Sequence, residues 1–180
     1  KTGILSATNT LLENAYYIIT PTALTPKEEI SEFRDFVLSL GAIPLILDYK
    51  IHDYSTAAIS HLPHMIAYSL VNLIHQIDDD KETMKTIAAG GFKDITRIAS
   101  SSPVMWQNIC ASNREPLLSL MDQYLALLTK LRGYIDSSNE QALLSFFQQA
   151  KDYRDSITLP SVKSPTVYYE CFVDLVDETG

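Results

Sequence analysis

The sequence predicts a mainly α-helical protein, with a short α/β segment in front of the helices and a single strand behind them. Three observations lead to this expectation. Apolar residues recur at helical spacing from residue 49 to residue 160. Residues 1–48 follow a strand–helix–strand pattern, and residues 161–180 contain a linker and one strand-like run. We therefore divide the chain into these three segments.

The first segment contains two short apolar runs, at 15–20 and 43–47, on either side of a helical pattern. Thr25 is expected to cap this helix, with Pro26 as its first residue, and Gly41 is expected to end it. A strand–helix–strand unit requires a parallel sheet with helices on both faces. Two strands do not complete such a sheet, so we expect the remaining strands to come from another chain or from sequence upstream.

The second segment is a series of amphipathic helices. The acidic run 78–80 is expected to end the first helix and cap the next, and the glycines at 90–91 interrupt the pattern. Ser102, Asn113 and Asn139 are expected to open three further helices. The apolar side of the helix after Asn113 comprises Leu117, Leu120, Met121, Tyr124, Leu127, Leu128 and Leu131. Because these apolar sides are wide, we expect a homodimer to bury the surplus.

Composition narrows the classes of function. The formal net charge is −8 and the basic residues are scattered, which argues against nucleic acid or an anionic membrane as a partner. No apolar run approaches the roughly 20 residues that span a bilayer. Cys110 and Cys171 form no disulfide framework and no zinc motif, so we expect two reduced thiols in a cytoplasmic protein without a bound metal.

The stretch Ser60-His-Leu-Pro-His64 places polar side chains in an apolar helix. His61 and His64 lie on one face, and Pro63 kinks the helix and leaves a carbonyl near Ile59 without its partner. The polar residues could satisfy backbone groups at the kink, bind a metal, or face a substrate. Without a third ligand nearby the metal signal is weak, and the residues alone favour the purely structural interpretation.

A second polar stretch runs from Gly90 to Arg97. Paired glycines allow a close backbone approach, and the helix start that follows them offers amide groups to an anion. Asp94 and Arg97 are three residues apart and can pair, and the guanidinium matches a carboxylate. The alternative is a surface ion pair worth at most about 1 kcal/mol. Trp106, the only tryptophan, is more often a core residue than a ligand platform.

No glycine-rich phosphate loop and no nucleophile motif occurs in the sequence. The two polar stretches together, however, resemble the prephenate/arogenate dehydrogenase family. The family has a Ser-His-Leu-Pro-His stretch preceded by a His-Asp pair, which corresponds to 60–64 and 52–53. It then has a Gly-Gly-Phe-x-Asp-x-Thr-Arg-Ile-Ala stretch and a tryptophan, which correspond to 90–99 and Trp106.

This resemblance implies an architecture. Residues 1–48 would be the end of a Rossmann-type nucleotide-binding domain, and 49–160 the helical substrate and dimerisation domain. Residues 161–180, with a strand at 167–176, would begin an ACT domain, a small ligand-sensing module. Regulation by tyrosine is a hypothesis that rests on this last strand.

The resemblance also implies a reaction, the oxidative decarboxylation of prephenate to 4-hydroxyphenylpyruvate with NAD or NADP. The family's nucleotide loop and catalytic histidine would lie upstream of Lys1, so we expect no catalytic residue in this chain and no activity from it alone. The alternatives are an arogenate dehydrogenase and a non-catalytic helical dimerisation module.

Substrate-binding roles follow from the resemblance position by position. Arg97 would hold a substrate carboxylate, with Asp94 orienting the guanidinium, and Gly90 would allow a close backbone approach. The pocket would be completed by Ser60, His61, His64 and Trp106.

Overall fold

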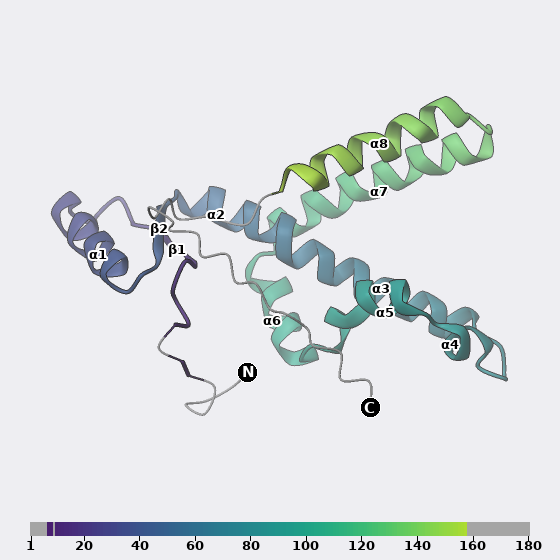
Figure 1. Ribbon diagram of the computed structural model, residues 1–180, viewed down its shortest axis with the longest axis horizontal. Coiled ribbons are helices and arrows are strands. Elements are labelled where there is room, and N and C mark those ends of the chain that lie inside the picture. Colours follow the sequence, from purple (N-terminus) through teal and green to yellow (C-terminus); the bar gives the residue numbers. More distant parts are fainter. Residues whose placement is uncertain (1–6, 9, 158–180) are drawn as a thin grey trace, which may run out of the picture.

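The computed structural model describes residues 7–8 and 10–157 and is mainly helical (Figure 1). The linker at 161–165, the strand expected at 167–176 and Cys171 lie outside these residues, so the ACT-like segment stays a prediction. In Figure 1 the α/β segment lies at one end, and two helical arms extend from the middle of the molecule in different directions. The helical architecture with a partial α/β segment in front confirms the predicted fold class.

The α/β segment consists of β1 (Tyr16–Ile19), α1 (Lys27–Ser39) and β2 (Ile43–Ile46). The two strands pair in parallel, as predicted, with Tyr16 opposite Ile43. Gly41 follows the helix with φ of 76°, a left-handed conformation that glycine adopts without strain. Thr25 was wrongly expected to cap α1: its hydroxyl accepts a hydrogen bond from the amide of Thr22, and the helix has no side-chain cap.

One long helix forms the centre of the molecule and is made of α2 (Tyr49–Thr56), the π-helical η2 (Ala57–His61) and α3 (Leu62–Ile77). Asp48 caps it by accepting a hydrogen bond from the amide of Lys50. In the π-helical turn the amide of Leu62 donates to the carbonyl of Ala57, five residues earlier. Pro63 explains the irregularity, because it has no amide hydrogen to continue the regular ladder.

By length and composition this central helix could cross a membrane, contrary to the sequence-based expectation. It has 29 residues, and an 18-residue window within it has a mean hydropathy of 1.2. Its polar groups, however, find partners at the ends of neighbouring helices: Asn113 donates to the carbonyl of Asp53, and Tyr68 donates to the carbonyl of Ser101. Helices that exchange hydrogen bonds in this way form one domain, so we interpret Tyr49–Ile77 as the central helix of that domain.

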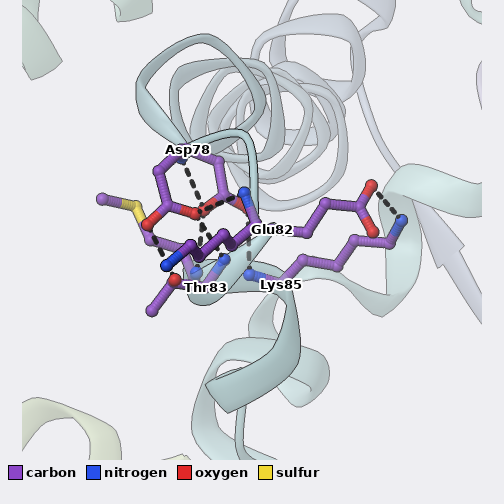
Figure 2. A network of polar contacts seen from close by, with 7 residues as sticks. Asp78, Glu82, Thr83 and Lys85 are labelled. Atoms are coloured by element: carbon purple, nitrogen blue, oxygen red, sulfur yellow. Dashed lines mark hydrogen bonds and ion pairs between the residues drawn. The ribbon is translucent and has the colours of Figure 1, made fainter.

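Three short helical pieces return along α3: α4 (Thr83–Ile87), α5 (Gly90–Thr96) and the 3-10 turn η3 (Arg97–Ser100). Figure 2 shows the polar network that joins the end of α3 to α4. The Asp78 carboxylate accepts hydrogen bonds from the amides of Met84 and Lys85, which confirms the predicted cap. Hydrogen bonds from Thr83 hold the pKa of Asp79 below its ordinary value. The glycine pair does not precede α5 but forms its first turn.

The last three helices are α6 (Pro103–Ser112), α7 (Arg114–Asp136) and α8 (Glu140–Ser156). Ser102 caps α6 by accepting a hydrogen bond from the amide of Met105, and Asn139 caps α8 by accepting one from Ala142. In Figure 1 α7 and α8 lie side by side as a hairpin that projects from the centre of the molecule. These helix starts confirm the sequence-based predictions at Ser102, Asn113 and Asn139.

The apolar core of the described part of the chain is small. Its buried hydrophobic residues are Val37, Ala42, Ala57, Ala67, Trp106, Leu117 and Leu120. Two belong to the α/β segment, and the others lie where α3, α6 and α7 meet the π-helical turn. The core therefore holds together the region that contains the polar stretch 60–64.

Candidate functional site

Trp106, on α6, contacts two histidines of the central helix, His61 and His64. Its side chain is only 6% exposed. The His64 ring stacks on the indole with 3.8 Å between ring centroids, and His61 meets the indole edge-on at 5.9 Å. The structure therefore brings together three of the predicted site residues, and Ser60 adjoins them through its backbone.

The π-helical turn determines how His64 is held. Its Nδ1 lies 2.9 Å from the carbonyl oxygen of Ser60. Because a carbonyl only accepts hydrogen bonds, Nδ1 must carry the proton, and in a neutral ring Nε2 is then an acceptor. His64 therefore satisfies a backbone group at the kink, as the structural interpretation predicted. It uses Nδ1 for this contact, so Nε2 is the ring nitrogen that the backbone at the kink does not use.

A second polar group lies on the other side of His61. The His52 Nδ1 is 2.9 Å from a carboxylate oxygen of Asp53, and the Asn113 amide nitrogen is 3.3 Å from Nδ1 of His61. These side chains border a cavity of about 290 Å³ between α2, η2 and the start of α7. We call His52, His61, His64, Trp106 and Asn113 the histidine junction.

Burial and neighbouring charges keep His61 neutral. Desolvation lowers the pKa of this histidine from its ordinary value of 6.5, and the nearby His64 and His52 lower it further. The Asp53 carboxylate acts in the opposite direction but does not cancel these effects. At neutral pH His61 is therefore an uncharged imidazole with one donor nitrogen and one acceptor nitrogen.

Trp106 also carries an unusual polar group. Its indole Nε1 is buried and has no hydrogen-bond partner among the residues that the structure describes. An unpaired buried donor costs about 1–3 kcal/mol. The indole nevertheless packs against His61 and His64 and gains the contacts of a buried aromatic ring.

Gly90, Asp94 and Arg97 form a separate group on α5 and η3, which pack against α3. All three are exposed. Within residues 7–8 and 10–157, no ion pair shorter than 4.0 Å joins Asp94 to Arg97, so the predicted pairing is absent there. An exposed pair gains little because ordering two long side chains offsets the attraction. The Arg97 guanidinium is therefore accessible to an external carboxylate.

The glycine at position 90 is not required by the packing of the described chain. A Cβ added there would meet no atom within 4 Å. The close backbone approach expected at Gly90 therefore stays a prediction.

A larger cavity of about 640 Å³ lies at the far end of α3, beside α4 and α5. It is bordered by Asp78 and Asp79, whose carboxylates already accept backbone hydrogen bonds from α4 (Figure 2). The acidic groups here stabilise helix starts, so we do not place the functional site in this cavity.

Sequence reasoning did not identify the contacts that Asn113 and Tyr68 make in the site. Asn113 precedes α7, as expected, but its side chain makes no cap hydrogen bond. Tyr68 meets Trp106 edge-on at 6.5 Å. Asn113 lies 60 residues from Asp53 and 52 from His61 in the sequence, so no local pattern reveals these contacts.

Comparison with known proteins places these features in a family. A family model described as "Prephenate dehydrogenase, dimerization domain" matches residues 48–149, which include the histidine junction and Arg97. Prephenate dehydrogenase of Bacillus subtilis is 37% identical over 180 residues, all of this chain and 48% of the relative. Cyclohexadienyl dehydrogenase of Zymomonas mobilis is 34% identical over 145 residues, 80% of this chain and 50% of the relative. The chain thus spans about half the length of these curated relatives.

Solved structures show the same relationship. Prephenate dehydrogenase of Aquifex aeolicus, crystallised with hydroxyphenyl propionate and NAD+, superposes with a TM-score of 0.82 at 29% identity, over 88% of this chain and 55% of that protein. Arogenate dehydrogenase of Synechocystis superposes with a TM-score of 0.77 at 28% identity, over 82% of this chain and 53% of that protein.

Proposed function

Since this chain belongs to the prephenate dehydrogenase family, we propose that it forms the substrate-binding and dimerisation part of an enzyme that oxidises and decarboxylates prephenate to 4-hydroxyphenylpyruvate. The observation that carries the proposal is the histidine junction, which lies within the matched residues 48–149. There two histidines contact a buried tryptophan, His64 by stacking and His61 edge-on, and they lie on the same long helix against which the Arg97 segment packs.

The proposed substrate is a dicarboxylate, and the described side chains suit one. Arg97 offers a planar guanidinium for a bidentate contact with a carboxylate, and Gly90 leaves room beside it. Asp94 would orient the guanidinium once substrate is bound. His61 and His64 each have a ring nitrogen that is not used by the backbone at the kink, and Trp106 forms the wall behind them.

The described residues do not fit a dinucleotide cofactor. The sheet has two strands among these residues, and Thr20-Pro21 rather than a glycine-rich loop follows β1. We therefore assign no residue of this chain to the cofactor and no catalytic role to its side chains. NAD+ is the favoured cofactor, because the Aquifex aeolicus relative was crystallised with it.

Two alternatives are supported by specific observations. The Synechocystis neighbour is an arogenate dehydrogenase and superposes almost as well as the prephenate enzyme, so arogenate is the second candidate substrate. A module that serves only dimerisation is the third candidate, because α7 exposes an apolar stripe. The stripe comprises Leu118, Met121, Leu125, Leu128 and Ile135.

We further propose that this stripe, which we call the outer stripe of α7, is the homodimer interface. Its members recur at helical spacing along one side of α7, and their exposed fractions run from 36% to 61%. Arg132 lies between Leu128 and Ile135, and the other members of the stripe follow one another at helical spacing. An exposed apolar stripe on a projecting hairpin is typical of an association surface. Regulation by tyrosine stays a prediction because the segment on which it rests lies outside the described residues.

The test is an assay of the gene's full-length product. Formation of reduced nicotinamide is followed with prephenate or arogenate and with NAD+ or NADP+ in turn. We expect turnover with prephenate and NAD+. Arg97→Ala should lower kcat/KM by about 10- to 150-fold, since hydrogen bonds to charged groups contribute about 1.5–3 kcal/mol.

The matched control is Arg154→Ala, which removes an equally exposed arginine from the last turn of α8. It should leave turnover unchanged. Absence of turnover with either substrate in a folded protein would leave the dimerisation module as the function. An equal loss in both arginine variants would remove Arg97 from the substrate site.

A further inference from the structure

Asn113 and Asn139 occupy the same position in two helices but use their side chains differently. Each is the residue that precedes the first turn, of α7 and α8 respectively. The Asn139 side chain accepts a hydrogen bond from the amide of Ala142, as a helix cap does. The Asn113 side chain makes no such bond and reaches across to α2 and η2 instead. Its role therefore lies outside its own helix.

The contacts of Asn113 fix which end of its amide faces His61. The amide nitrogen lies 2.8 Å from the carbonyl oxygen of Asp53, which can only accept a hydrogen bond. The group there must therefore be the NH2 and not the amide oxygen. The same nitrogen lies 3.3 Å from Nδ1 of His61. Since an NH2 group only donates, Nδ1 of His61 must be unprotonated, and the proton of the neutral ring lies on Nε2.

His64 has the opposite arrangement. Its Nδ1 lies against the carbonyl of Ser60 and so carries the proton, which leaves its Nε2 as an acceptor. The two histidines that contact Trp106 thus differ in their free nitrogens: His61 offers a donor and His64 an acceptor.

We propose that Asn113 is a positioning residue for His61, which it holds in the tautomer with the proton on Nε2, so that His61 and His64 form a donor–acceptor pair for the substrate. The part of this inference that concerns the substrate rests on the proposed function, whereas the tautomer of His61 does not. The groups that face His61 are His52 and Asp53 from α2, His64 from α3 and Trp106 from α6. Burial and the neighbouring histidines lower the pKa of His61 and favour the neutral ring that the pair requires.

The first experiment is nitrogen NMR of the chain labelled with 15N at its side chains. The chain has four histidines, so a His61→Gln variant identifies the His61 ring signals by their loss. We expect the His61 Nδ1 signal at the position of an unprotonated ring nitrogen, and the His64 Nδ1 signal at that of a protonated one. A protonated Nδ1 on neutral His61 would overturn the proposal.

Since a free imidazole in water already favours the proton on Nε2, the decisive variant is Asn113→Asp. It replaces a donor by a carboxylate, which can only accept. We expect the His61 proton to move to Nδ1, or the ring to become charged at a higher pH. Asn139→Asp is the matched control: it makes the same change before α8 and leaves the signals of His61 in place. Unchanged His61 signals in Asn113→Asp would contradict the proposal.

A measurement on the unaltered chain covers the case in which Asn113→Asp does not fold. When pH is lowered, protonation of His61 at Nδ1 must break the contact with Asn113. The side-chain amide signals of Asn113 should therefore shift with the same midpoint as the His61 ring. Amide signals that stay constant through the His61 titration would overturn the assignment.

An enzyme assay of the same two variants distinguishes this inference from the proposed function. In the full-length product, Asn113→Asp should lower kcat/KM for prephenate by about three- to tenfold, the worth of one neutral hydrogen bond. Asn139→Asp should leave kcat/KM for prephenate unchanged. A tautomer switch without a change in turnover would support the positioning of His61 by Asn113 and contradict the placement of His61 at the substrate. A loss of turnover without a switch would overturn the positioning role.

Discussion

The histidine junction holds His61 and His64 by hydrogen bonds within the chain, whereas the α7–α8 hairpin leaves large apolar groups in solvent. In the junction Trp106 is 6% exposed and each contacting histidine has a defined partner. On the outer stripe of α7, Leu125 is 58% exposed and Ile135 is 61% exposed. Both regions belong to one matched domain. The difference indicates that contacts within one chain order the first region, and it is the reason why we propose the second as the surface that meets a partner.

The largest expected effect concerns how much the histidine junction contributes to the stability of the folded chain. Trp106→Ala should lower the free energy of unfolding by about 3–5 kcal/mol, because it leaves a cavity beside His64. Val104→Ala, a truncation on the same helix at a side chain that is 67% exposed, should change it by less than about 0.5 kcal/mol. Urea denaturation followed by circular dichroism measures both.

A Trp106→Phe variant sharpens the same test. It keeps an aromatic ring against His64 and removes the unpaired Nε1 donor, so it should cost less than Trp106→Ala. Equal losses in Trp106→Ala and Val104→Ala would show that the junction does not hold the domain together. Equal losses in the two tryptophan variants would show that the size of the indole matters more than its stacking.

The second prediction concerns the hairpin. Leu125→Asp places a charge in the middle of the outer stripe and should weaken dimerisation at least about 30-fold, since central apolar contacts contribute about 2 kcal/mol or more. Helix content should remain, because the side chain is already exposed in the single chain. Sedimentation velocity over a dilution series measures the association.

Ala126→Asp is the control for the hairpin. It adds the same charge at the next residue of α7, which is also exposed and lies away from the outer stripe. Unchanged association in Leu125→Asp, or an equal loss in the two variants, would show that the dimer forms through another surface.

The elements that sequence reasoning predicted correctly depend on nearby residues. The strand–helix–strand unit, the turn at Gly41 and the caps at Ser102 and Asn139 all involve partners within a few positions. Helix irregularity near Pro63 also follows from a missing amide hydrogen. Local stereochemistry decides these features, so one sequence is enough to find them.

Features that depend on distant partners could not be predicted in the same way. The apolar side expected on α7 divides into two: Leu117 and Leu120 are buried, whereas Met121 and Leu128 are exposed together with Leu125. Periodicity identifies apolar faces but not which neighbour covers each of them. The role of Asn113 was hidden for the same reason, because a polar residue before a helix has the sequence signature of a cap.

The smallest expected effect is one of pH, and it tests whether the junction depends on a neutral His61. The folded chain holds the pKa of His61 below 6.5, mainly through burial, so between the folded value and 6.5 the unfolded chain binds more protons. Stability present above pH 6.5 is therefore lost as the pH falls through this window. The loss is modest because the side chain is only partly buried and solvent screens it.

Urea denaturation at a series of pH values measures this loss, and His61→Gln should flatten the dependence. His75→Gln is the matched control, because it removes a histidine of the same helix that lies outside the histidine junction. If both variants flatten the pH dependence of the free energy of unfolding equally, the loss of stability in acid does not depend on His61 in particular. If only His61→Gln flattens the pH dependence, the neutral imidazole beside Asn113 and Trp106 contributes to the stability of the junction. The stability of the hairpin should instead depend on protein concentration, because we propose that it dimerises.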